Sequence, residues 1–139
     1  MRRWTRMTKG DRGSELLTGL IQRIRVGWPG SAWEWDERLD CALSTVAKAE
    51  DAQALALLAG QLGEPFSPAT VRAAPAALQQ ICARTGGLRA SQLAFATTLA
   101  DGGTVYCLWW PWASGASFSA RVGAAGDLTP VVRSAFALK

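Results

Sequence analysis

The stretch that decides the fold runs from Leu93 to Trp110 and has the sequence LAFATTLADGGTVYCLWW. Its first part alternates between larger side chains, such as Leu93 and Phe95, and small or polar ones, which is typical of a half-buried β-strand. The residues Asp101-Gly102-Gly103 are typical of a hairpin turn, because they adopt positive φ angles at little cost. We therefore predict two antiparallel strands joined by a short turn.

The second of these strands is apolar on both of its faces. Its alternating side chains form two sets, which are Val105, Cys107 and Trp109 on one side and Tyr106, Leu108 and Trp110 on the other. A strand of this kind is central in its sheet or covered on both sides. Pro111 ends it, because proline donates no backbone hydrogen bond. A third strand is predicted over residues 116–122, which completes an antiparallel meander.

Apolar residues recur with the helical period before and after this meander. The predicted helices are one from an N-cap at Ser14 to Gly27, one over 31–46 with the capping box Ser31 and Glu34, one over 51–62, one over 75–84, and one that starts at Thr129-Pro130. Whether residues 31–62 form one helix or two stays open at this point. Each helix has an apolar stripe that a neighbouring element would cover.

This order of elements predicts an α+β fold, with N-terminal helices packed on a three-stranded antiparallel meander and a short C-terminal helix. Residues 14–139 are predicted to form a single domain. Residues 1–13 are basic and contain glycine, which predicts a disordered tail. The alternative is a division into a helical part, 14–85, and a sheet part, 90–139.

Composition narrows the class of protein. Of the 139 residues, 49% are hydrophobic and 19% are charged, which is typical of a globular chain. No apolar run approaches the roughly 18 residues of a membrane span, so no membrane partner is expected. The cysteines Cys41, Cys82 and Cys107 are odd in number and far apart in the sequence. They predict buried thiols in a reducing compartment, most simply the cytoplasm.

The chain contains no histidine, which removes the commonest general base and the commonest metal ligand. Serine or cysteine nucleophiles that depend on histidine are thereby excluded. Asp36 and Asp40 would share one face of a helix, but a solvated acidic face explains that spacing better than a metal site. We therefore predict no catalytic residues, no metal and no cofactor.

The tryptophan-rich end of the meander is the candidate binding site. It comprises Tyr106, Leu108, Trp109, Trp110 and Trp112. Tryptophan is enriched in binding hot spots because it buries a large area and loses little rotamer entropy. The hypothesis is a small non-enzymatic protein-interaction module of the adaptor, chaperone or inhibitor type, which binds a protein or peptide through its sheet and this loop. Self-association is compatible with it, and a two-sided core is the alternative explanation of the tryptophans.

Two other functions stay open. The net charge is +4, and the arginines Arg2, Arg3, Arg6, Arg89 and Arg121 are candidates for electrostatic contacts. A nucleic-acid-binding domain would use them on phosphates while the tryptophans stack on bases. The second alternative is a small-ligand-binding protein or a histidine-independent enzyme, with the meander as one wall of a pocket.

Overall fold

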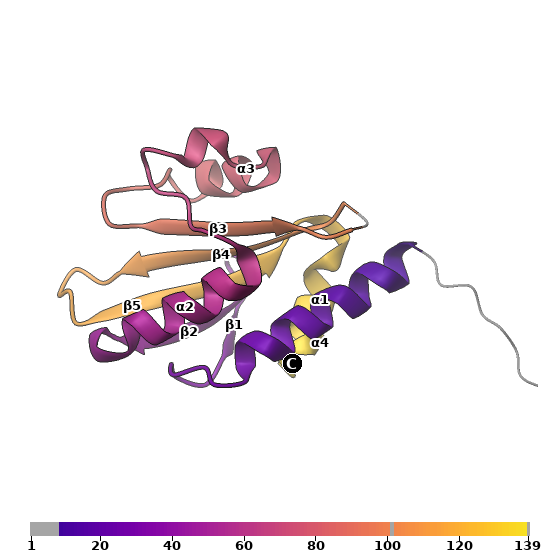
Figure 1. Ribbon diagram of the computed structural model, residues 1–139, viewed down its shortest axis with the longest axis horizontal. Coiled ribbons are helices and arrows are strands. Elements are labelled where there is room, and N and C mark those ends of the chain that lie inside the picture. The colour runs from indigo at the N-terminus through magenta and orange to yellow at the C-terminus, as the bar shows by residue number, and fades with distance from the viewer. Residues whose placement is uncertain (1–8, 101, 139) are drawn as a thin grey trace, which may run out of the picture.

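The structure is a computed structural model that describes residues 9–100 and 102–138. This part of the chain contains four α-helices, α1 (Lys9–Arg25), α2 (Asp51–Leu62), α3 (Ala76–Arg84) and α4 (Thr129–Ala135), shown in Figure 1. It also contains five strands, β1 (Glu34–Asp36), β2 (Cys41–Ala47), β3 (Leu93–Thr98), β4 (Thr104–Pro111) and β5 (Ser117–Ala124). The short 3-10 helices η1 (Lys48–Glu50), η2 (Val71–Ala73) and η3 (Gly126–Leu128) precede α2, α3 and α4. The class is α+β, as predicted.

The strands form one antiparallel sheet in the order β1-β2-β5-β4-β3. The predicted meander is present as β3, β4 and β5, and β4 ends at Pro111. The sheet is nevertheless larger than predicted, because β2 pairs with the free side of β5 and β1 pairs with β2. In this register, Tyr106 of β4 lies opposite Gly123 of β5, and Trp110 lies opposite Ser119.

The helix predicted over residues 31–46 is wrong, since this segment forms the β1–β2 hairpin. Ser31 does not cap a helix: its hydroxyl oxygen accepts the backbone N–H of Thr45 at 2.9 Å, and its own N–H donates to the Thr45 carbonyl at 2.8 Å. In β2, alternate side chains such as Ala42 and Val46 are fully buried. Pairing with β5 satisfies the backbone of β2, and this tertiary contact overrides the local helical period.

The other predicted helices are present, with shifted ends. The helices α2 and α3 match the predicted ranges 51–62 and 75–84 to within one residue. The helix α1 begins at Lys9 and not after Ser14, so the predicted start of the first helix is wrong. Of the predicted tail, residues 1–8 lie outside the described residues.

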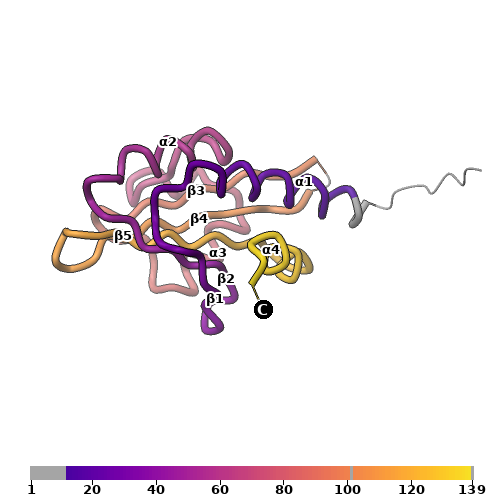
Figure 2. The backbone as a smooth tube through the Cα atoms, turned by 90° about the horizontal axis from the view of Figure 1, so that it is seen from below, coloured from indigo at the N-terminus to yellow at the C-terminus, as the bar shows by residue number. Residues whose placement is uncertain are grey.

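Two hydrophobic cores lie on opposite faces of the sheet. The larger core joins α1, α2 and α4 to the β4 side chains Val105, Cys107 and Trp109. Figure 2 shows α1 and α2 along one side of the sheet. The smaller core joins α3 to Tyr106 and Leu108, and α3 packs mainly on β3 and β4. The prediction that this strand is central in its sheet or covered on both sides is therefore confirmed, since β4 has a strand on each side and a core on each face.

All three cysteines are buried and none forms a disulfide, as predicted. In the described part of the chain, no helix has the length and apolar character that spanning a bilayer requires.

A buried serine of β2 forms hydrogen bonds that hold the segment after α1 against the sheet. Ser44 is 1% exposed, and its hydroxyl donates to the Ser31 carbonyl at 2.7 Å. The indole N–H of Trp28 donates to the Ser44 oxygen at 2.9 Å. A Cβ atom on Gly30 would lie 2.6 Å from both the Ser44 oxygen and the Trp28 nitrogen, so only glycine leaves room for this contact.

We predict that Ser44→Ala lowers the free energy of unfolding by about 1–3 kcal/mol, because a buried donor and a buried acceptor lose their partner. Urea unfolding measures the change. Ser117→Ala, on the neighbouring strand β5 and only partly buried, is the control and is expected to change stability by less than about 0.5 kcal/mol. Equal effects of the two variants would contradict this assignment.

Candidate functional site

The structure divides the predicted tryptophan site between core and surface. Trp109 is 1% exposed and stacks on Phe118 in the larger core, with ring centroids 4.8 Å apart. Tyr106 and Leu108 are buried in the smaller core. Trp110 is partly buried, and Trp112 is 50% exposed. Of the five predicted residues, the two tryptophans at the end of β4 and just after it therefore remain accessible.

These two tryptophans belong to a fixed cluster, which we call the aromatic patch: Trp110, Trp112, Ser119 and Arg121. The indole N–H of Trp112 donates to the Ser119 hydroxyl at 3.0 Å. The guanidinium carbon of Arg121 lies 4.5 Å from the ring centroid of Trp110. Both aromatic rings are thus held from β5, a strand in the middle of the sheet.

Arg121 is itself anchored by a carboxylate. Its Nε atom lies 3.6 Å from Asp36 Oδ2, which is an ion-pair distance but longer than a hydrogen bond, and both side chains are largely buried. The other oxygen of Asp36 accepts the backbone N–H groups of Arg38 and Leu39 at 2.9 and 3.2 Å. Asp36, which the sequence placed on an acidic helix face, therefore links the β1–β2 turn to β5.

The arginines predicted to make electrostatic contacts have different positions. Arg121 is engaged by Asp36 and Trp110. Arg89 is exposed in the segment between α3 and β3. Arg2, Arg3 and Arg6 lie outside the described residues. The structure therefore assembles no arginine cluster at the aromatic patch within the part of the chain that it describes.

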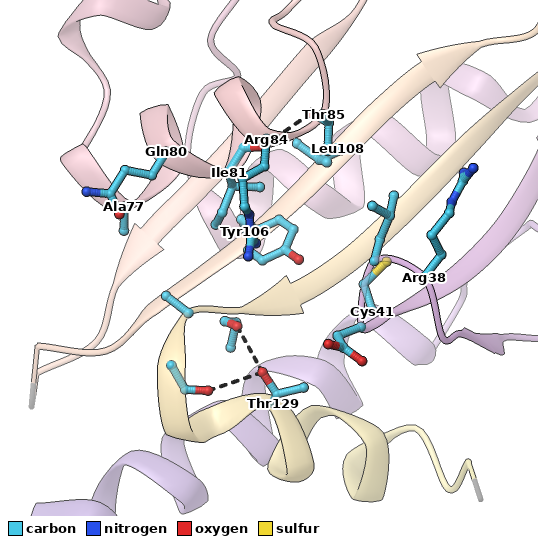
Figure 3. A pocket seen from close by; sticks show the side chains of 15 residues that line it. Arg38, Cys41, Ala77, Gln80, Ile81, Arg84, Thr85, Tyr106, Leu108 and Thr129 are labelled. Carbon is cyan, nitrogen blue, oxygen red and sulfur yellow. Dashed lines mark hydrogen bonds between the residues drawn. The ribbon is translucent and has the colours of Figure 1, made fainter.

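Next to the patch, a groove of about 610 Å³ lies between α3 and the β1–β2 turn. Figure 3 shows Gln80 and Arg84 of α3 on one side and Arg38 and Cys41 on the other, with Tyr106 between them. The volume is within the usual range of small-molecule sites. Sequence reasoning missed this groove, because its walls come from segments far apart in the chain.

Tyr106 forms the floor of the groove through an unusual approach to β5. A Cβ atom on Gly123 would collide with the Tyr106 ring and hydroxyl, so the ring lies directly over the glycine backbone. Its hydroxyl points toward the side of Cys41 (Figure 3). Tyr106 is only 3% exposed, and within the described chain its hydroxyl has no hydrogen-bond partner. Burial raises the pKa of Tyr106, so its hydroxyl stays protonated and able to donate.

The thiol in the groove is unsuited to nucleophilic chemistry. Burial, reinforced by the negative charge of Asp36, raises the pKa of Cys41 to about 12. The reactive form of cysteine is the thiolate, which is scarce at neutral pH for such a group. The groove can therefore offer hydrogen bonds and charge, through Tyr106, Arg84 and Asp40, rather than an activated nucleophile.

Comparisons of this chain with protein-family models, with curated proteins and with solved structures find no match. The functional argument therefore depends on the geometry of the aromatic patch and of the groove.

The raised pKa of Cys41 predicts how stability depends on pH. In the unfolded chain this thiol ionises near its ordinary pKa of 9.0, whereas in the folded protein it ionises only near 12. Between these values the unfolded state loses its proton first, so the free energy of unfolding falls as pH rises. At pH 10.5 we expect this thiol to contribute a loss of about 1–2 kcal/mol relative to pH 8.

Urea unfolding of the wild type and of Cys41→Ala at both pH values measures this contribution. Comparing the two proteins removes the effects of the other ionising groups. The loss of stability between pH 8 and pH 10.5 should be smaller in Cys41→Ala, and identical losses would show that folding does not raise the pKa of this thiol.

Proposed function

We propose that this protein is a small protein-interaction module without catalytic activity, and that it binds a protein or peptide through the aromatic patch. The observation that carries the proposal is Trp112, which is 50% exposed and yet fixed in orientation by its hydrogen bond to Ser119. Large aromatic side chains held on a rigid element are typical of binding hot spots.

The rigidity of the patch bears on affinity. A side chain that is already ordered loses little conformational entropy when a partner covers it. Trp110 packs against the smaller core and beneath Arg121, and Arg121 is held by Asp36. The side chains of the patch have therefore already lost their conformational entropy on folding. The exposed part of Trp112 remains for a partner to bury.

The charges around the patch favour a protein partner over a nucleic acid. Nucleic-acid sites combine stacking aromatics with cations that neutralise phosphates. Here the arginine next to the tryptophans is already paired with a carboxylate, at 3.6 Å. An apolar protein surface with hydrogen-bond acceptors matches the exposed indole better than a phosphate chain does.

We predict that Trp112→Ala abolishes or strongly weakens partner binding while the protein stays folded. Tagged wild-type protein, Trp112→Ala and Leu16→Ala are compared as baits in extract of the native cell, after nuclease treatment and with a wash at high salt. Leu16 on α1 is 40% exposed and serves as the matched control. The supporting result is a defined protein retained by the wild type and by Leu16→Ala but lost with Trp112→Ala.

Two outcomes would contradict the proposal. Retention of the same proteins by Trp112→Ala would remove the patch from the interaction. Binding that depends on nucleic acid and disappears in high salt would favour the nucleic-acid alternative, because counterion release makes phosphate contacts steeply salt-dependent. Circular dichroism of each variant confirms that loss of binding does not reflect unfolding.

A further inference from the structure

We propose that the groove between α3 and the β1–β2 turn binds a small organic carboxylate that also carries an amino group, with Tyr106 and Arg84 as the donors to its carboxylate. This site is separate from the aromatic patch and does not depend on the function proposed for that patch.

The first argument is the unpartnered hydroxyl of Tyr106. The side chain is 3% exposed, and no described residue accepts from or donates to its hydroxyl. The ring is buried, but the hydroxyl atom itself is not sealed from solvent, so it can be reached from the groove and can donate to a ligand there. The hydroxyl lies at the floor of a groove large enough for a ligand, so a ligand atom can supply the missing partner.

The second argument is the cation beside that hydroxyl. Arg84 extends from α3 toward the Tyr106 ring, as Figure 3 shows, and its positive charge acts on the ionisation of Tyr106. In the described chain Arg84 has no ion-pair partner. A guanidinium and a neutral hydroxyl that converge on one point are both donors, and a carboxylate accepts from two donors at once.

The polar side chain just after α3 does not compete for this role. The hydroxyl of Thr85, which also lines the groove, already donates within its helix to the carbonyls of Ile81 and Cys82, at 3.2 and 3.0 Å. Tyr106 and Arg84, together with the side-chain amide of Gln80, are thus the donors on this side that make no side-chain hydrogen bond within the described chain.

The wall of the groove formed by the β1–β2 turn determines which other chemical groups the ligand carries. Asp40 lies there and, like Arg84, has no ion-pair partner among the described residues. Arg38 lies on the same wall, so this wall carries one charge of each sign, and the Asp40 carboxylate is the group there that can accept from an ammonium group on the ligand. Between the two walls, the side chains of Leu39, Ile81 and Leu108 provide apolar surface for the body of the ligand. A zwitterion with an apolar side chain, such as an aromatic amino acid, satisfies all three features.

Titration followed by ¹H–¹⁵N NMR tests the proposal with three related probes. L-phenylalanine carries both groups, 3-phenylpropanoate lacks the amine, and phenylalaninamide lacks the carboxylate. We expect saturable shifts of the Gly123, Ala125 and Gly126 amides with L-phenylalanine, weaker binding of 3-phenylpropanoate, and the weakest binding of phenylalaninamide. Absence of saturable shifts with both carboxylates up to about 10 mM would overturn the proposal, as would equal binding of phenylalaninamide.

Variants of the two donors assign their roles. Tyr106→Phe and Arg84→Gln should each raise the dissociation constant of L-phenylalanine about tenfold, because each removes a hydrogen bond to a charged group. Arg72→Gln, an exposed arginine outside the groove, and Trp112→Ala should leave it unchanged. Unchanged affinity in Tyr106→Phe would overturn the assignment.

A stability measurement separates this role from a structural one. Because the free protein makes no hydrogen bond to the Tyr106 hydroxyl, Tyr106→Phe should not lower the melting temperature in the absence of ligand. It should reduce the rise in melting temperature that L-phenylalanine produces in the wild type. A clear drop in the melting temperature of the free variant would show that the hydroxyl has an internal partner, and would overturn the proposal.

Discussion

The antiparallel pairing of β4 with β5 is the contact on which the rest of the structure depends. The strand β4 is buried on both faces, so its two sets of side chains supply the centre of both cores. Its neighbour β5 also pairs with β2 on its other side, which brings the β1–β2 hairpin into the sheet. Loss of this pairing would expose Trp109 on one face and Tyr106 on the other, and would leave β2 without a partner.

The two faces of the sheet are covered to different extents, and this difference creates both candidate sites. Three helices contribute to the larger core, whereas α3 is the helix of the smaller core and packs mainly on β3 and β4. Every second residue of β5 points to the less covered face of the sheet, and these residues are Ser119, Arg121 and Gly123. Ser119 holds the aromatic patch, Gly123 lies under the groove, and Arg121 lies between the two sites with Asp36 as its counter-ion.

Much of the fold could be predicted, and the errors have a common cause. The strands β3, β4 and β5 and the helices α2 and α3 were predicted because their periodicity and turn residues are local properties. The segment 31–46 was misassigned, because Ser31 and Glu34 fit a capping box, and only pairing with β5 makes the segment a hairpin. Of the predicted tryptophan site, Trp110 and Trp112 are accessible, whereas Trp109, Tyr106 and Leu108 are core residues.

The sequence by itself determined the alternation of β4, and with it a strand that is central in its sheet or covered on both faces. It also determined the absence of histidine chemistry, since composition does not depend on folding. Only the tertiary structure decided which side chains remain accessible, because exposure depends on how far α3 reaches across the sheet. The ion pair between Asp36 and Arg121 and the placement of Tyr106 over Gly123 likewise join residues that are distant in the chain, and no local pattern encodes such contacts.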